Sequence, residues 1–250
     1  MTTSEPSKTP IYRQIAYQLI GEIQSGVYQP GDRLPSENQL ATQYQVHRLT
    51  IRHALNLVIE QRLAFRHQGK GTFVTEPRVN YVINQHTNFT HNLRELGYLP
   101  CLKILEAQQI SATEPLTELL EISQGSELVK IKLLRTASPQ IKTLQNPEFQ
   151  PLCISLSYLP LNYFPEILTE IHQARSLYSF LRNHYGIKPR RTHTQIETSS
   201  PSQEDIDLLK MPVNVPILIT RGVVRDVHNR AIEYTISRFR GDRFTLEITC

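Results

Sequence analysis

The 250-residue chain contains little cysteine, and Cys101, Cys153 and Cys250 are scattered along it. An odd number of cysteines without a C-x-x-C pair argues against a disulfide framework or a structural zinc site, so we expect buried free thiols. The chain also lacks any apolar run near the length of about 18 residues that a membrane-spanning helix needs. Its first residues show no charged-then-apolar signal pattern. These absences predict a soluble, cytoplasmic protein.

Signatures of catalysis are missing as well. No segment matches a Gly-rich phosphate loop, a nucleophile elbow or a histidine cluster with metal-ligand spacing. The nine histidines are dispersed along the chain. We therefore expect no metal, no cofactor and no enzyme. The net charge of +4 permits nucleic-acid contact without requiring it.

The first 76 residues do contain a distinctive pattern, which begins with two helices. Ser36-Glu37-Asn38-Gln39 matches a capping box that would start one helix. After a short turn, a helix beginning near Arg48 would place apolar residues at i, i+3, i+4, i+7 and i+8 on one face. That face consists of Ile51, Ala54, Leu55, Val58 and Ile59. The opposite face offers Arg and Asn side chains, which read guanine and adenine edges in a major groove, so the pair has the outline of a helix-turn-helix.

A short hairpin is predicted directly after these helices. Its strands, residues 63–67 and 72–75, flank the sequence Gln68-Gly69-Lys70-Gly71. The glycines permit a tight tip, from which Lys70 can reach a DNA phosphate. An ordinary helix pair with a solvated basic face is the alternative for the helices alone. With the hairpin, the segment is better interpreted as a winged DNA-binding module.

Three motifs carry a resemblance to a known family. They are Leu34-Pro35-Ser36-Glu37-x-x-Leu40-Ala41, Arg48-x-Thr50-Ile51-Arg52 and Gly69-x-Gly71-Thr72-Phe73. They resemble the winged helix-turn-helix of the GntR family of bacterial transcription regulators. In that family a Ser or Thr usually stands at the position of His47, as the cap of the recognition helix. The resemblance implies ten DNA-contacting residues: Ser36, Asn38, His47, Arg48, Leu49, Thr50, Arg52, Gln68, Gly69 and Lys70.

The rest of the chain predicts a second domain over residues 85–250, joined to the first domain (1–76) by a linker at 77–84. Strand patterns alternate with short helical ones, which predicts an α+β domain with an antiparallel sheet and inserted helices. The segments Ser157-Tyr158-Leu159-Pro160 and Ile232-Glu233-Tyr234-Thr235 resemble the UTRA effector-binding domain of the HutC branch of GntR regulators. That domain has a chorismate-lyase-like fold. Arg190-Arg191-x-x-x-x-Ile196 is most similar to phosphonate-utilisation regulators within the branch.

This second resemblance implies an effector pocket between the two hairpin systems. The implied contact residues are Asn88, Thr90, Arg135, Ser157, Glu233 and Phe239. An Arg fork meets two oxygens of a phosphate or phosphonate at once. Leu133 stands where the branch has a second Arg, so the second cation is missing or comes from elsewhere, for instance from Lys132 or Arg221. Arg135 and Glu233 paired in a dry core is the alternative, and the insertion at 138–150 is expected near the pocket mouth.

The leading hypothesis is a homodimeric, ligand-responsive repressor that binds a two-fold operator in double-stranded DNA. The resemblance implies its release by a small anionic effector, with a phosphonate or a phosphate-bearing metabolite favoured. One alternative is a dimeric DNA-binding protein without small-molecule input. The other is an enzyme of chorismate-lyase-like fold, which the missing catalytic motifs disfavour.

Overall fold

The computed structural model describes residues 9–61, 63–67, 69–75, 78–85, 87–139 and 149–248. The chain divides into two compact units, residues 1–77 and 78–250. None of the described helices is both long enough and apolar enough to cross a membrane. In the described part of the chain, no three His, Cys, Asp or Glu side chains are grouped so that they could hold a metal ion.

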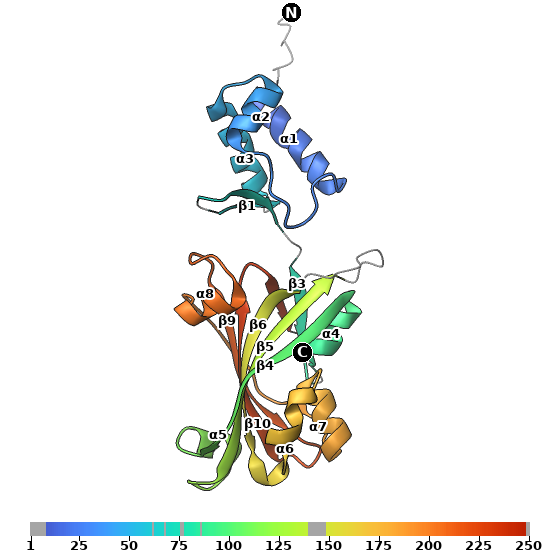
Figure 1. The fold of residues 1–250 in the computed structure, drawn as a ribbon, viewed down its shortest axis with the longest axis vertical. Helices are drawn as coiled ribbons and strands as arrows, with labels where there is room; N and C mark the ends of the chain where they lie inside the picture. Colours follow the sequence, from blue (N-terminus) through green and yellow to red (C-terminus); the bar gives the residue numbers. More distant parts are fainter. Residues whose placement is uncertain are drawn as a thin grey trace, which may run out of the picture. The chain divides into compact units, whose positions relative to one another are not determined.

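The first unit is a three-helix module with a β-hairpin (Figure 1). Its elements are α1 (Ile11–Gln24), α2 (Glu37–Tyr44), α3 (Arg48–Glu60), β1 (Ala64–His67) and β2 (Gly71–Val74). The apolar stripe predicted for α3 is buried at Ile51, Ala54, Leu55 and Val58. These side chains pack against Leu19 of α1 and its neighbours in one core. The winged helix-turn-helix fold predicted from the motifs is therefore confirmed.

The second unit is built on one antiparallel sheet with the strand order β4-β5-β6-β10-β9-β7, in which β8 also pairs with β9. The strands are β4 (Tyr98–Ser111), β5 (Glu127–Pro139), β6 (Gln150–Pro160), β7 (Arg190–Arg191), β8 (Gln195–Ser199), β9 (Ile217–Arg225) and β10 (Ala231–Arg240). This sheet confirms the predicted α+β class. The segment with the Arg190-Arg191 motif contains two separate strands, β7 and β8, and the insertion noted at 138–150 begins as a continuation of β5. Residues 140–148 lie outside the described residues.

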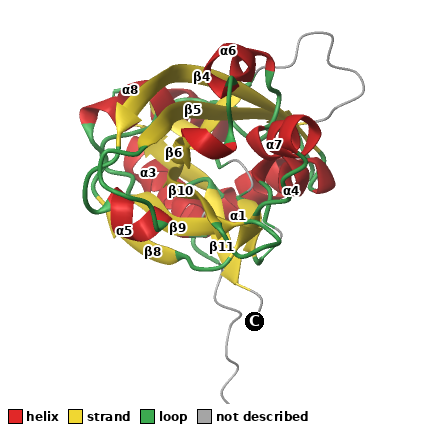
Figure 2. Ribbon diagram, turned by 90° about the horizontal axis from the view of Figure 1, so that it is seen from below, coloured by secondary structure: helices red, strands yellow, loops and turns green. Residues whose placement is uncertain are grey.

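Helices cover both faces of this sheet (Figure 2). They are α4 (Phe89–Glu95), α5 (Leu116–Leu120), α6 (Ile167–Glu170), α7 (Leu177–Tyr185) and α8 (Gln203–Leu209), with 3-10 turns at Leu161–Tyr163 and Ile171–Gln173. Because side chains alternate along a strand, β5 divides its apolar residues between the faces. Val129, Ile131 and Leu133 pack with α6 and α7, whereas Leu134 packs in the cluster that contains Leu209 of α8.

The expected linker at 77–84 is wrong for most of its length. Val79–Ile83 forms strand β3, which pairs in parallel with β11 (Phe244–Ile248). Val79, Tyr81 and Ile83 alternate inward and pack in an aromatic cluster with Phe89 and Phe239. The low charge of this segment reflects the burial of β3. The C-terminal strand β11 therefore pairs with β3 and not with the preceding strand β10 of the main sheet.

The cysteines differ from expectation in part. Cys153 is a buried free thiol on β6, and burial raises its pKa to about 11. Cys101 is a free thiol but is exposed on β4. Cys250 lies outside the described residues.

Candidate DNA-binding surface and effector pocket

The N-terminal end of α3 is capped by an unusual residue. The imidazole Nδ1 of His47 accepts a hydrogen bond from the backbone N–H of Leu49 at 3.3 Å. This contact satisfies one of the donors left free at a helix start. His47 therefore caps α3 in place of the Ser or Thr that usually stands at this position in the family whose motifs the sequence resembles. The side chain of Leu49 is 54% exposed beside it.

A single carboxylate organises the basic side chains of the first unit. Glu37 on α2 accepts hydrogen bonds from Arg48 Nε at 2.8 Å and from Arg52 Nε at 3.2 Å. Arg66 of the hairpin approaches the same carboxylate at 3.7 Å. The hydrogen bond from Arg52 is the main cause that holds the pKa of Glu37 below its ordinary value. The Glu37 side chain is only 18% exposed, whereas those of Arg48 and Arg52 are 56% and 44% exposed.

The other predicted DNA contacts lie on the helix pair and at the hairpin tip. Ser36 forms the predicted capping box with Gln39, so its hydroxyl is engaged within α2. Asn38 is exposed on α2, and Thr50 is partly exposed on α3. Gly69, with φ of +74°, and Lys70 are exposed at the tip, whereas Gln68 lies outside the described residues.

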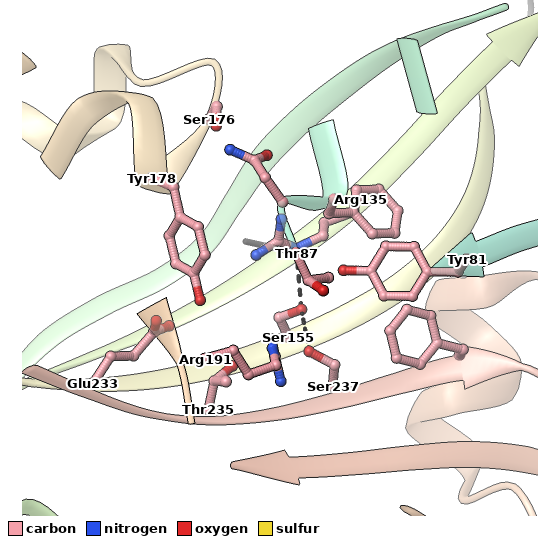
Figure 3. Close-up of a pocket in the computed structure, with 13 residues that line it drawn as sticks. Tyr81, Thr87, Arg135, Ser155, Ser176, Tyr178, Arg191, Glu233, Thr235 and Ser237 are labelled. Carbon is pink, nitrogen blue, oxygen red and sulfur yellow. Dashed lines mark hydrogen bonds between the residues drawn. The ribbon is translucent and has the colours of Figure 1, made fainter. Parts of the chain in front are cut away.

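The second unit contains a polar pocket on the sheet face that α4 and α7 cover (Figure 3). The space between its walls is about 380 Å³, a figure that includes open solvent at its mouth. Strands β5, β6 and β10 supply Arg135, Ser155 and Glu233, while α7 supplies Tyr178. The remaining lining residues are Tyr81, Thr87, Asn88, Phe89, Ser176, Arg191, Thr235, Ser237 and Phe239. Such a mixture of cations and hydroxyl groups suits a small polar ligand.

Arg135 is held in place from two sides. Its Nε donates a hydrogen bond to Ser155 Oγ at 3.1 Å, and Ser155 Oγ lies 3.0 Å from Ser237 Oγ. The guanidinium also stands over the ring of Phe89, with its Cζ 5.1 Å from the ring centroid. A cation–π contact of this kind orients a guanidinium and leaves its edges available. The Nη groups of Arg135 can therefore donate to an anion in the pocket.

The Glu233 carboxylate is held in place by a hydrogen bond from the hydroxyl of Ser157. Ser157 Oγ donates to Glu233 Oε1 at 2.5 Å, and both residues are buried. Among the described residues, Glu233 Oε2 has no hydrogen-bond partner. Arg135 donates to Ser155 and Glu233 accepts from Ser157, rather than the two charged groups forming an ion pair. The arrangement thus opposes the alternative of a dry internal salt bridge.

Four of the six predicted effector residues line the pocket: Asn88, Arg135, Glu233 and Phe239. Ser157 does not line it, because its hydroxyl is used to hold Glu233. Thr90 is buried on α4 and lies outside the lining. Asn88 has a structural role too, since its Oδ1 accepts from the backbone N–H of His91 at 3.2 Å and so caps α4.

Neither cation suggested as a substitute for the missing family Arg reaches the pocket. Lys132 pairs with Glu204, and Arg221 pairs with Glu197 at 2.8 Å. The second guanidinium of the pocket belongs instead to Arg191. The Arg190-Arg191 pair that carries the likeness to phosphonate regulators is the signal that could have identified it. Tyr81 was missed because its strand was expected to be a linker.

Comparison with known proteins finds a family match in each of the two units. Residues 11–74 match the gntR family of bacterial regulatory proteins, and residues 95–245 match the UTRA domain. The HTH-type transcriptional repressor NagR of Bacillus subtilis is 30% identical over 245 residues, which cover 98% of this chain and 96% of that protein. The chain belongs to the GntR family. It is therefore a ligand-responsive, DNA-binding transcription regulator with a UTRA domain, and not an enzyme.

One further relative and one solved structure are similar to this chain over nearly its whole length. The mannosyl-D-glycerate transport/metabolism system repressor MngR of Escherichia coli is 31% identical over 241 residues, 95% of each protein. The crystal structure of PhnF from Mycobacterium smegmatis has a TM-score of 0.64 and is 24% identical. It covers 94% of this chain, and this chain covers 98% of it. At that identity the structural likeness supports the fold alone.

Proposed function

We propose that this GntR-family regulator is a repressor, released from its operator by a small anionic effector with phosphonate or phosphate chemistry. Residues 1–76 bind the DNA, and the UTRA unit binds the effector and dimerises. Two of the relatives described above are named repressors, which supports this sign of regulation. The observation that carries the proposal is the Arg135 guanidinium, fixed by Ser155 and Phe89 at the wall of a polar pocket.

The ligand chemistry follows from the pocket's charges. Two guanidiniums, those of Arg135 and Arg191, and one carboxylate, that of Glu233, give the wall a positive balance. A planar guanidinium meets two oxygens of an oxyanion at once, so an acid group binds at Arg135. Glu233 Oε2 accepts a hydrogen bond from a hydroxyl or amine elsewhere on the ligand. The small volume limits the effector to a compact metabolite.

The DNA-binding side uses the exposed basic groups of the first unit. Arg48 and Arg52 contact base edges or nearby phosphates from α3, and Lys70 contacts a phosphate from the hairpin tip. A single winged module buries only about 600–1,000 Å² of protein surface on DNA, which limits its selectivity. Two modules in a homodimer double the phosphate contacts and require a two-fold operator.

A thermal-stability screen tests the effector class. Methylphosphonate, glucose 6-phosphate and neutral glucose are each added to the wild type and to Arg135→Ala, and the melting temperature is followed. A ligand that binds only the native state raises it by mass action. The proposal expects stabilisation by an anion of the panel in the wild type and none in Arg135→Ala. Stabilisation by the neutral sugar alone, or equal stabilisation of both proteins, would contradict it.

A further inference from the structure

The position where the branch has a second Arg cannot supply an anion contact in this chain. Leu133 fills it, and its side chain is fully buried in the core between β5 and the helices α6 and α7. Lys132 points to the opposite face of the sheet, where it pairs with Glu204 of α8. A second cation at the effector must therefore come from another element.

Arg191 enters the same pocket from the far edge of the sheet. It lies on the two-residue strand β7, opposite Val224 of β9, and its backbone N–H donates to the carbonyl of Gln85 at 2.9 Å. Its side chain lines the pocket together with Arg135, Tyr178 and Glu233 (Figure 3). Two neighbouring backbone contacts thus fix the point from which the guanidinium extends.

The guanidinium of Arg191 is incompletely satisfied. Its Nε is buried and has no hydrogen-bond partner among the described residues. Burial opposes the charge of Arg191, the nearby Glu233 carboxylate favours it, and the pKa of Arg191 lies above its ordinary value. The group is therefore charged at neutral pH. A buried donor of a charged group without an acceptor is unfavourable, and an incoming anion would remove that cost.

We infer that Arg191 is the second anion-binding residue of the effector pocket and that it replaces the Arg lost at Leu133. This inference rests on the proposed function. Arg135 and Arg191 together hold one oxyanion that has at least three oxygens, such as a phosphate or phosphonate. A carboxylate has only two oxygens, and Arg135 can occupy both in a bidentate pair. Arg191 therefore sets the preference for phosphonate over carboxylate.

The test compares binding of methylphosphonate and acetate by the full-length wild type, Arg191→Met and Arg190→Ala. Methionine keeps the length and the apolar stem of Arg191 but removes the charge. Arg190 is the matched control, because it is the exposed neighbour on β7 and its Nη2 donates to Gln85 Oε1 at 3.2 Å. Affinities are measured by calorimetry, and the melting temperature of each free protein is recorded.

Arg191→Met is expected to weaken methylphosphonate binding at least tenfold, to change acetate binding little and to leave the melting temperature of the free protein unlowered. A structural arginine would instead lower that temperature on replacement. Arg190→Ala is expected to bind both anions as the wild type does. Unchanged methylphosphonate affinity in Arg191→Met would overturn the role of Arg191 alone. A wild type that binds neither anion would overturn the proposed function as well.

Loss of binding in Arg191→Met together with a lower melting temperature is resolved by Arg191→Lys. Lysine restores the charge without the planar fork. Recovery of stability with methylphosphonate affinity still reduced supports anion binding by Arg191. Full recovery of both would show that only a positive charge is needed, and the assignment of two guanidiniums on one oxyanion would be wrong.

Discussion

Arg52 of the recognition helix donates two hydrogen bonds to Glu37 of the preceding helix, from Nε to Oε1 at 3.2 Å and from Nη2 to Oε2 at 3.1 Å. The same carboxylate accepts from Arg48 at 2.8 Å. A side chain that is fixed before binding loses less rotational freedom on DNA. Glu37 therefore places both arginines on the outer face of α3 in a defined geometry, although its negative charge itself repels DNA phosphates.

Replacing Glu37 by Gln is expected to reduce DNA selectivity. The loss of a negative charge strengthens binding to any duplex, whereas the released arginines lose their fixed geometry at the operator. We expect the ratio of operator to random-DNA affinity to fall about tenfold, which corresponds to about 1.4 kcal/mol. Fluorescence anisotropy with both duplexes at one salt concentration measures this ratio.

Glu60→Gln is the control for this substitution. It removes the same charge from the exposed C-terminal end of α3, away from the three arginines that approach Glu37. The control should slightly strengthen binding to both duplexes and leave the ratio of operator to random-DNA affinity unchanged. Equal ratios in Glu37→Gln and Glu60→Gln would show that Glu37 acts only through its charge.

Arg48→Ala and Arg52→Ala should each weaken operator binding. A bidentate contact between Arg and a guanine edge contributes about 1–3 kcal/mol to discrimination. Both side chains are about half exposed on α3, so DNA can reach them while Glu37 holds them. Titration of operator and random duplexes gives the two affinities. If both variants bind the operator as the wild type does, α3 does not read it in this way.

Lys70→Ala should weaken binding to every DNA duplex by the same factor. Lys70 is exposed at the hairpin tip beside Gly69, where a long cation reaches the DNA backbone rather than a base edge. Loss of one phosphate contact reduces the slope of log affinity against log salt by about one. The slope is obtained from titrations at several salt concentrations. A loss confined to some operator sequences would mean that the hairpin reads bases or groove shape.

Asp205→Asn should destabilise the UTRA unit. Asp205 is buried, caps α8 with Ser202, and accepts from Arg238 Nε at 2.7 Å and Nη2 at 2.6 Å. Removing one partner of such a pair leaves Arg238 uncompensated and costs about 3 kcal/mol. Urea unfolding of the variant and the wild type measures the difference. An unchanged unfolding midpoint would show that the ion pair adds nothing to stability.

The same carboxylate makes the wild type sensitive to acid. Burial of Asp205 opposes ionisation, but the hydrogen bonds from Arg238 and Ser202 outweigh it and lower the pKa. A depressed pKa adds stability that is fully present above the unfolded-state value of about 3.9 and is lost as pH falls through the folded-state value. The wild type should therefore lose free energy of unfolding below about pH 3.9 as Asp205 is protonated. Asp205→Asn should not show this contribution to the loss, which unfolding curves at several acidic pH values would measure.

The sequence was sufficient for the first unit, because local rules determine it. The capping box at Ser36, the apolar stripe through Ile51 and the glycine at position 69 each act within a few residues. Those signals do not depend on what the rest of the chain does. The predicted start of the recognition helix and the predicted ends of both hairpin strands therefore lie within one residue of those observed.

The pocket was found only in part, because its walls come from distant segments. Arg135 and Glu233 lie on strands whose patterns are strong, and the family resemblance identified them. Arg191 lies on a two-residue strand, which has too few residues for a periodicity, and only pairing with β9 shows where it extends. Tyr81 was assigned to a linker, since a five-residue buried strand without neighbours resembles a domain boundary in sequence.

Effector control of this regulator requires that an anion at Arg135 weakens operator binding. The coupling must be reciprocal, because a ligand shifts an equilibrium only by its different affinity for the two states. The anion that stabilises the wild type most in the thermal screen is the probe. Operator affinity is measured with and without saturating probe, in the wild type and in Arg135→Ala.

We predict that the probe weakens operator binding by the wild type about 5- to 150-fold, the usual range for coupled sites. Saturating operator should weaken binding of the probe by the same factor, and Arg135→Ala should show neither effect. Equal operator affinity with and without the probe in the wild type would rule out effector control through Arg135. So would an undiminished response in Arg135→Ala, since the probe would then act from another site.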